Sequence, residues 1–177
     1  GMGTSGSFEV DAAGREPLKE VLRRFVAGGA SVIDTSPNYS NAEDVLGDLI
    51  ADLGARDQLF LATKLSAVRG REAGLAQFEA SLARLRTDRI DLLQVHNLGD
   101  WEVQLALARE LKEQGRVRYV GLTHYRDDAH EALATAVRRA RPDFLQINYS
   151  VTQRAAETHL LPLARELGVA VLANRNF

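Results

Sequence analysis

The stretches Leu59-Phe-Leu-Ala-Thr-Lys64 and Ile90-Asp-Leu-Leu-Gln-Val-His96 decide the fold of this chain. Each is a short, mostly apolar run without strict alternation, which predicts a strand buried on both faces. Between them, the segment from Arg71 to Arg86 carries apolar residues three and four positions apart, which is typical of an amphipathic helix. A strand, a helix and a second buried strand in this order predict a parallel sheet covered by helices.

The same alternation of strands and helices occupies the rest of the chain. Further strands are expected at Ser31 to Asp34, Tyr119 to Thr123, Phe144 to Asn148 and Val169 to Asn174. Further helices are expected at Pro17 to Ala27, from near Asn41 to Leu53, at Trp101 to Gln114, at Asp127 to Ala140 and at Pro162 to Leu167. Pro17 suits the first position of its helix, where a missing N–H costs nothing. Asn41 is a good residue to cap the next one.

Two architectures satisfy this pattern, a TIM barrel and an open doubly wound sheet. The open sheet usually has a glycine-rich turn between a strand and its helix, and none of these expected strands is followed by one. Polar residues recur at nearly every strand end, which favours the barrel. We therefore predict one α/β domain over residues 1–177 with the architecture of a TIM-type barrel.

Four residues of different chemistry lie at strand ends or shortly after them: Asp34, Tyr39, Lys64 and His96. In a barrel these strand ends meet at one face, so the four side chains should converge. An acid, a phenol, an amine and an imidazole in one pocket make a proton-transfer site. Taken singly, each residue has a structural alternative. Asp34 is then a turn cap and Tyr39 a packed aromatic of the loop. Lys64 is a solvated strand end, and His96 is a core histidine whose hydrogen bonds are satisfied within the protein.

Several segments, in this order, resemble motifs of the aldo-keto reductase family from Met2 to Phe177. They are Met2-Gly-Thr4, Asp34-Thr-Ser-Pro-Asn-Tyr39 with the helix from Glu43 to Gly47, Ala62-Thr-Lys64, Asp91-Leu-Leu-Gln-Val-His96, Gly121-Leu-Thr-His-Tyr125 and Gln146-Ile-Asn-Tyr149. The resemblance implies a (β/α)8 barrel that binds a nicotinamide cofactor without a Rossmann fold. It also implies the reduction of aldehydes and ketones to alcohols.

The resemblance assigns a role to each of the four residues. Tyr39 is implied as the general acid, Lys64 as its assisting cation, Asp34 as the partner of Lys64, and His96 as the group that orients the carbonyl. General chemistry agrees, because hydride arriving at a carbonyl carbon leaves negative charge on the oxygen, which then needs a proton and fixed donors. A phenol alone is a poor acid near neutral pH, and an adjacent ammonium favours its ionised form.

The resemblance also implies a cofactor, NADPH with NADH as an alternative, since no side chain supplies hydride. The residues implied to contact it are Gly3, Thr4, Asp34, Thr123, His124, Gln146 and Asn174. Two positions depart from the family. Thr123-His124 replaces Ser-Asn, and His124 either contacts the nicotinamide or supports a residue that does. Asn174 stands where many members have a stacking Tyr, although some carry Asn-Arg-Pro-Phe, close to Asn174-Arg-Asn-Phe177.

The substrate pocket is expected to include Tyr39 and His96 together with Trp101, which follows the fourth strand. Trp101 alternatively packs against its own helix. The substrate is expected to be a small-molecule carbonyl compound, but the sequence does not identify which one. No pair of histidines has metal-ligand spacing with an acid on a strand face, so no metal is expected.

The composition excludes several classes of function. With 26% charged residues and a formal net charge of -2, the chain has no basic run that would favour nucleic acid or an anionic membrane. It has no cysteine, which excludes disulfides and thiolate metal sites. No apolar stretch approaches the ~20 residues of a membrane-spanning helix. The expected location is the cytoplasm.

The length predicts an incomplete barrel. A full barrel of this type needs about 250 residues, and the 177 here are expected to hold a partial first strand through the seventh, without the eighth βα unit. The exposed edges of the first and seventh strands then favour self-association. Three functions remain open: a carbonyl reductase, a non-catalytic relative that binds cofactor or a partner, and an inactive fragment.

Overall fold

The computed structural model describes residues 1–176, and Phe177, the last residue of the segment compared with Asn-Arg-Pro-Phe, lies outside them. The strands are β1 (Met2–Gly3), β2 (Val32–Asp34), β3 (Phe60–Leu65), β4 (Ile90–His96), β5 (Val117–His124), β6 (Phe144–Asn148) and β7 (Ala170–Asn174). The helices are α1 (Ala12–Ala27), α2 (Ala42–Leu53), α3 (Arg71–Leu85), α4 (Trp101–Glu113), α5 (His130–Ala140) and α6 (Leu160–Leu167). Short 3₁₀ turns lie at η1 (Arg56–Gln58), η2 (Asp127–Ala129) and η3 (Ala155–Thr158).

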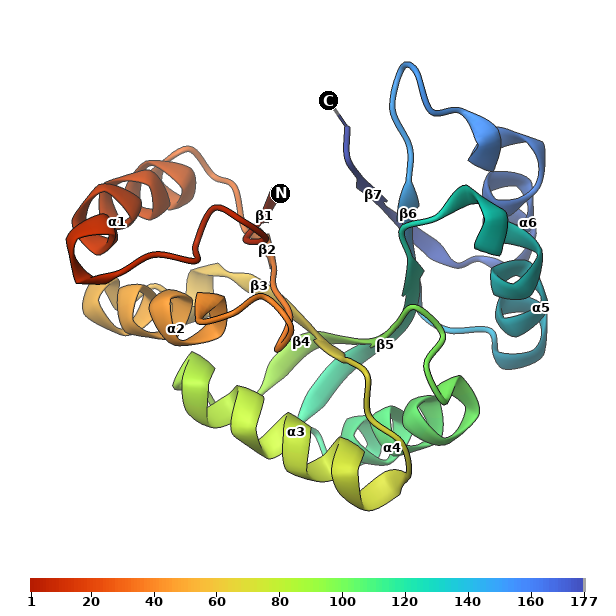
Figure 1. Cartoon of the computed structure of the whole chain (residues 1–177), viewed down its shortest axis with the longest axis horizontal. Helices are drawn as coiled ribbons and strands as arrows, with labels where there is room; N and C mark the ends of the chain where they lie inside the picture. Colours follow the sequence, from red (N-terminus) through yellow and green to blue (C-terminus); the bar gives the residue numbers. More distant parts are fainter. Residues whose placement is uncertain (177) are drawn as a thin grey trace.

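The seven strands form one parallel sheet in the order β1 to β7. The sheet curls, the helices cover its outer side, and the two termini face each other across the open side between β1 and β7 (Figure 1). This sequential order confirms the predicted partial TIM barrel. It excludes the doubly wound alternative, in which the strand order reverses. Residues 1–176 contain no eighth strand.

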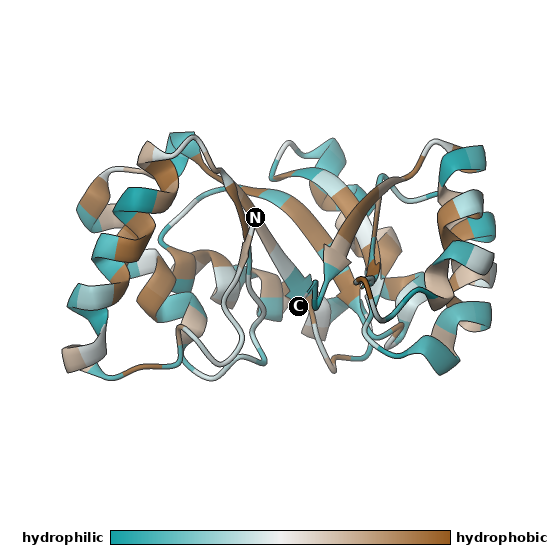
Figure 2. Cartoon of the chain, turned by 90° about the horizontal axis from the view of Figure 1, so that it is seen from above, coloured by the Kyte–Doolittle hydropathy of each residue, from teal (hydrophilic) through white to brown (hydrophobic). Residues whose placement is uncertain are grey.

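Every second residue of each strand points its side chain to the concave side of the curled sheet. Apolar residues dominate the strands and the helix faces turned toward them (Figure 2). Near the start of three strands, the rings of Phe60, Tyr119 and Phe144 lie 5.4–6.0 Å apart and fill the interior. Because successive side chains of a strand point to opposite faces, Lys64 shares the inner face with Phe60. Aromatic packing thus fills one end of the curl, and polar side chains occupy the other.

Three expected helix starts and one expected cap differ from the structure. Helix α5 begins at His130, after the turn η2, and α6 begins at Leu160, so that Pro162 lies inside it rather than at its start. Helix α1 begins at Ala12, and Pro17 lies inside it rather than at its first position. The reason is a cap further upstream, where the Asp11 carboxylate accepts a hydrogen bond from the Gly14 N–H at 3.1 Å. Asn41 does precede α2, but its side chain makes no capping bond. It donates instead to the carbonyl of Val10 at 2.8 Å, so a tertiary contact replaces the local one.

Gly1, Gly3 and Gly6 have the spacing G-x-G-x-x-G, yet they do not form a strand-to-helix turn of the dinucleotide-binding type. Gly3 ends the two-residue strand β1, and α1 begins only at Ala12. In the register of the sheet Gly3 lies beside Asp34 of β2. The segment with these glycines therefore pairs with the end of β2 instead of opening a helix.

Helix α2, which follows the loop that carries Tyr39, is anchored by a buried acid. Glu43 is 1% exposed and accepts hydrogen bonds from the hydroxyl of Thr63 (2.6 Å), the hydroxyl of Ser81 (3.1 Å) and Nε of Arg84 (2.8 Å). One turn later Gly47 packs so closely on α3 that a Cβ would lie 2.1 Å from the Arg84 carbonyl oxygen. These contacts hold the end of the Tyr39 loop in place.

None of the helices within residues 1–176 is long and apolar enough to cross a membrane.

Candidate active site

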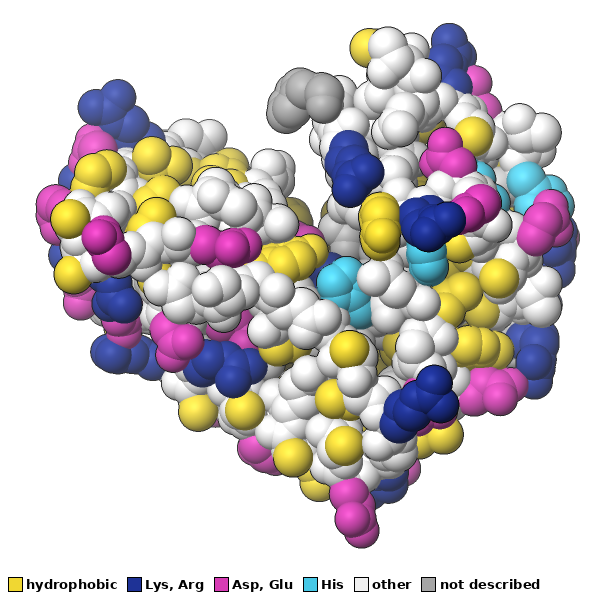
Figure 3. Space-filling view, in the orientation of Figure 1, with side chains coloured by type: hydrophobic (Ala, Val, Ile, Leu, Met, Phe, Trp, Pro, Cys, Tyr) yellow, Lys and Arg dark blue, Asp and Glu magenta, His cyan; other side chains and the backbone are white. Residues whose placement is uncertain are grey.

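A pocket of about 390 Å³ lies at the carboxyl ends of the strands. It is lined by Gly3, Thr4, Ser5, Asp34, Tyr39, Lys64, His96, Asn97, Thr123, Tyr125, Gln146, Asn174 and Arg175. A notch opens over this part of the molecule, with histidine side chains near its base (Figure 3). Strand ends thus bring together residues more than a hundred positions apart, and all four of the proton-transfer candidates are among them.

Lys64 and Asp34 form the charged centre of this pocket. The Lys64 side chain is 2% exposed, and its Nζ lies 2.8 Å from Oδ2 of Asp34. The same ammonium donates to the carbonyl oxygen of Thr35 at 2.7 Å. A buried charge needs such partners to offset the loss of water, so the two acceptors from the end of β2 fix the position of the amine.

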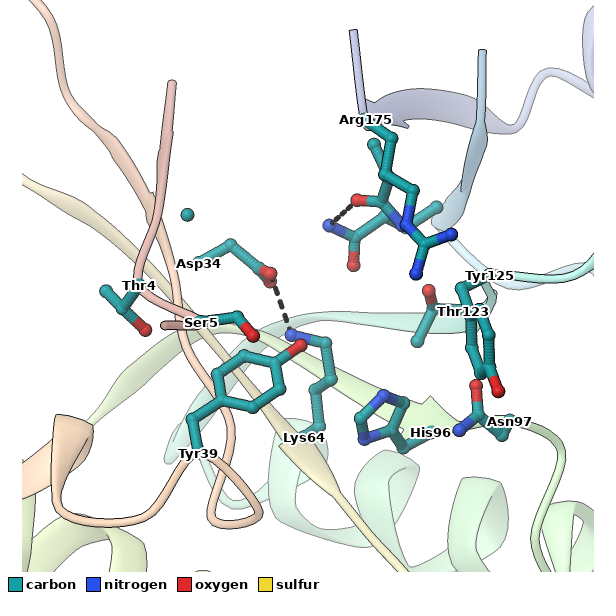
Figure 4. Close-up of a pocket in the computed structure, with 13 residues that line it drawn as sticks. Thr4, Ser5, Asp34, Tyr39, Lys64, His96, Asn97, Thr123, Tyr125 and Arg175 are labelled. Carbon is teal, nitrogen blue, oxygen red and sulfur yellow. Dashed lines mark hydrogen bonds and ion pairs between the residues drawn. The ribbon is translucent and has the colours of Figure 1, made fainter. Parts of the chain in front are cut away.

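The phenol of Tyr39 lies next to this ion pair. Nζ of Lys64 is 5.2 Å from the centroid of the Tyr39 ring, and the Tyr39 hydroxyl points toward the ammonium (Figure 4). The ring meets that of His96 edge to face, with centroids 6.2 Å apart. A tight turn, in which the Tyr39 N–H donates to the Ser36 carbonyl at 3.0 Å, places the ring there. Phenol, ammonium and imidazole therefore surround one space.

His96 is largely buried and neutral at neutral pH. Burial, and next the positive charge of Lys64, lower the pKa of His96 from 6.5 to about 4. Its Nδ1 contacts the hydroxyl of Ser66 and lies 3.4 Å from the hydroxyl of Ser36. Within residues 1–176 no group forms a hydrogen bond with Nε2, so this nitrogen remains available for a ligand in the pocket.

A chain of side-chain amides connects the ion pair to the far strands. Nε2 of Gln94 donates to Oδ1 of Asp34 at 3.3 Å and to Oε1 of Gln146 at 2.8 Å. Gln146 in turn donates to Oδ1 of Asn174 at 2.7 Å. The sequence did not point to Gln94, although its position two residues before His96 puts both on the same face of β4. The amides link β2, β4, β6 and β7 across the interior.

Two residues expected at the site do not line the pocket. His124 follows Thr123 in β5 and so points to the opposite side of the strand. There its Nδ1 accepts from the Arg126 N–H at 3.1 Å, and burial lowers the pKa of the imidazole. Trp101 packs at the start of α4, with the guanidinium of Arg139 5.4 Å from its ring centroid.

Four lining residues were not anticipated from the sequence: Ser5, Asn97, Tyr125 and Arg175. Each lies just after a strand end, which is the signal that could have found them. Asn97 and Arg175 have positive φ angles of 56° and 51°. The Arg175 guanidinium lies 5.1 Å from the centroid of the Tyr125 ring and reaches into the pocket (Figure 4). The described residues hold no cluster of His, Asp and Glu side chains able to bind a metal ion.

Comparison with known proteins gives concordant matches. The family model described as "Aldo/keto reductase family" matches residues 1–176. Aldo-keto reductase YhdN of Bacillus subtilis (strain 168) is 31% identical, over 86% of this chain and 50% of its own length. Aldo-keto reductase str7 of Strobilurus tenacellus is 33% identical, over 97% of this chain and 53% of its own length.

Among solved structures, an aldo/keto reductase from Klebsiella pneumoniae in complex with NADP and acetate superimposes with a TM-score of 0.85 at 30% identity. The match covers 98% of this chain and 62% of that one. The chain thus spans about half the length of the curated relatives that it matches. Since the family model extends over the whole described chain, the chain belongs to the aldo/keto reductase family.

Proposed function

We propose that this chain forms the catalytic half of an NADPH-dependent carbonyl reductase in which Tyr39 is the general acid. The observation that carries the proposal is the group of Tyr39, the buried Lys64–Asp34 ion pair and neutral His96 around one pocket. Membership of the aldo/keto reductase family supports an oxidoreductase. The NADP in the structure of the Klebsiella pneumoniae relative supports the choice of cofactor.

The pocket offers groups that suit a nicotinamide. The carboxamide group of a nicotinamide needs hydrogen-bond donors and acceptors at fixed positions. The Thr123 hydroxyl makes no hydrogen bond with any described residue, while Gln146 and Asn174 present side-chain amides. Thr123 lies near the end of β5, Gln146 in the middle of β6 and Asn174 at the end of β7, and these three strands are neighbours in the sheet. We assign them to the carboxamide, with the backbone at Gly3 and Thr4 on the facing wall.

The four central residues then act on the carbonyl group of a small-molecule substrate. A bound nicotinamide supplies hydride to the carbonyl carbon. Tyr39 donates its phenolic proton to the carbonyl oxygen, and the nearby Lys64 ammonium stabilises the phenolate that remains. Asp34 and the Thr35 carbonyl hold that ammonium. His96, neutral and within the same space, donates a hydrogen bond to the oxygen as negative charge develops there.

The test compares wild type with Tyr39→Phe in the NADPH-dependent reduction of 4-nitrobenzaldehyde. Loss of a general acid costs on the order of 10² to 10⁴ in rate, while the affinity for NADPH, measured by cofactor fluorescence, should change little. Tyr149→Phe is the matched control, because the Tyr149 hydroxyl donates to Glu157 and the residue does not line the pocket. Equal turnover of wild type and Tyr39→Phe would remove Tyr39 from the mechanism.

A further inference from the structure

Two buried serines lie behind His96, on the side away from the pocket. Ser66 directly follows β3 and is 1% exposed, and Ser36 lies in the loop after β2 and is fully buried. The Ser66 hydroxyl contacts Nδ1 of His96, and the Ser36 hydroxyl lies 3.4 Å from the same nitrogen. The two hydroxyl oxygens are 3.3 Å apart. One ring nitrogen of His96 therefore has two hydroxyl partners, and the other faces the pocket.

We propose that Ser66, supported by Ser36, is a positioning residue that holds neutral His96 in the tautomer with its proton on Nε2. In this tautomer the N–H of the ring is directed at the position of the substrate oxygen. The consequence for catalysis rests on the proposed carbonyl reduction, whereas the tautomer itself does not depend on it.

The proposal follows from counting the protons in this buried cluster. The backbone N–H of Asn38 donates to the Ser36 oxygen at 3.3 Å, so the Ser36 proton is free to point at the Ser66 oxygen. The Ser66 proton then points at Nδ1, which accepts it, and the ring proton must lie on Nε2. Each of these donors has an acceptor in this arrangement.

The other tautomer interrupts this series of hydrogen bonds. With the proton on Nδ1, the ring donates to the Ser66 oxygen and Ser66 donates to the Ser36 oxygen. The Ser36 proton then has no acceptor among the described residues, because its oxygen contacts only Ser66, His96 and the Asn38 N–H. A buried donor without an acceptor is strongly disfavoured. The cluster therefore selects Nε2–H.

Ser66 is held firmly enough for this task. The side-chain amide of Gln77 on α3 pairs with its backbone in both directions, accepting from the Ser66 N–H at 2.7 Å and donating to the Ser66 carbonyl at 2.9 Å. The alternative role of a serine next to a histidine is a nucleophile. Ser66 is too buried to meet a substrate, and a histidine whose charged form is disfavoured by burial is a weak base.

The test is nitrogen-15 NMR of the histidine rings at neutral pH, which distinguishes Nε2–H, Nδ1–H and the doubly protonated ring. The signal of His96 is the one lost in His96→Gln. The charged and titratable groups around this ring are Lys64, Asp34, Tyr39 and His124, and none of them is altered by the serine variants. Wild type should show the Nε2–H form. Ser66→Ala and the double variant with Ser36→Ala should show a mixture of tautomers.

The kinetic readout is turnover of 4-nitrobenzaldehyde. Removing one donor to a developing oxyanion costs about 10² to 10³ in rate. The double variant should lose at most about tenfold, less than the full cost of a missing donor, because a ring without the serines still visits the productive tautomer. Ser66→Thr keeps the hydroxyl and should restore the wild-type ring spectrum. Ser81→Ala removes another buried serine hydroxyl, the one that donates to Glu43, and should leave the His96 spectrum unchanged.

A wild-type His96 with its proton on Nδ1, or doubly protonated at neutral pH, would overturn the proposal. So would an Nε2–H ring that persists unchanged in the double variant. If Ser66→Ala does not fold, Ser36→Ala alone decides the question: the Ser66 proton then has only Nδ1 as its acceptor among the described residues, so the Nε2–H form should persist, and a shift to Nδ1–H would overturn the proposal. If wild type shows the Nε2–H form but reduces no carbonyl compound, the proposed function fails while the positioning role of Ser66 stands.

Discussion

Acid should weaken the fold through His96. The folded protein holds the pKa of His96 at about 4, against an ordinary value of 6.5. At about 1.36 kcal/mol per pKa unit this difference corresponds to about 3.4 kcal/mol, and partial exposure of the ring reduces it to roughly 2 kcal/mol. Because the pKa is lowered, the unfolded chain binds this proton more readily than the folded one. The contribution of His96 to the free energy of unfolding is therefore fully present above pH 6.5 and is lost as the pH falls toward 4.

The measurement is the free energy of unfolding by urea at pH 7.5, 5.5 and 4.5, for wild type and His96→Gln. Other groups titrate in this range in both proteins, so the difference between the two isolates the imidazole. The wild type should lose about 2 kcal/mol more than the variant between pH 7.5 and 4.5. If the difference in unfolding free energy between wild type and His96→Gln stays constant with pH, burial and the charge of Lys64 do not lower the pKa of His96.

Three further predictions concern the fold around the site. Asp34→Asn leaves the buried ammonium of Lys64 without its carboxylate and should cost about 3 kcal/mol of unfolding free energy, whereas Asp52→Asn, which removes an exposed pair with Lys19, should leave the same urea titration nearly unchanged. Gly47→Ala should lower stability by about 1–3 kcal/mol or more, because its Cβ would overlap the backbone of α3, and an unchanged unfolding midpoint would contradict the close packing. A polypeptide of these 177 residues should self-associate through the edges of β1 and β7, which pair with no further strand within residues 1–176, with light scattering as the assay and a monomer at every concentration as the contrary result.

The fold was predictable because its signals are local. Apolar runs and helical periodicity gave the strands, the helices and their parallel arrangement. The start of α1 was missed, since the segment before Pro17 has no apolar stripe and the Asp11 cap lies upstream of it. The predicted capping bond of Asn41 was wrong for the opposite reason. A carbonyl distant in the sequence, that of Val10, satisfies its side chain instead.

The site was predictable where it depends on strand ends. Asp34 and His96 end their strands and Lys64 is the last residue but one of β3, and the structure brings them together with Tyr39 in one pocket. The supporting residues could not be found this way. Ser36 and Ser66 become partners of one ring nitrogen only when two loops pack behind it, and nothing in the spacing of serines along a chain signals such a contact.

The central claim is hydride transfer to a carbonyl at this site, and the most direct test follows the hydride itself. The 177-residue protein is incubated with 4-nitrobenzaldehyde and NADPH that carries two deuterium atoms at C4 of the nicotinamide. The mass of the product alcohol is then determined by mass spectrometry. The alcohol from wild type should carry one added deuterium and should form on the order of 10² to 10⁴ faster than with Tyr39→Phe. An unlabelled product, or no product from folded wild type saturated with cofactor, would contradict it.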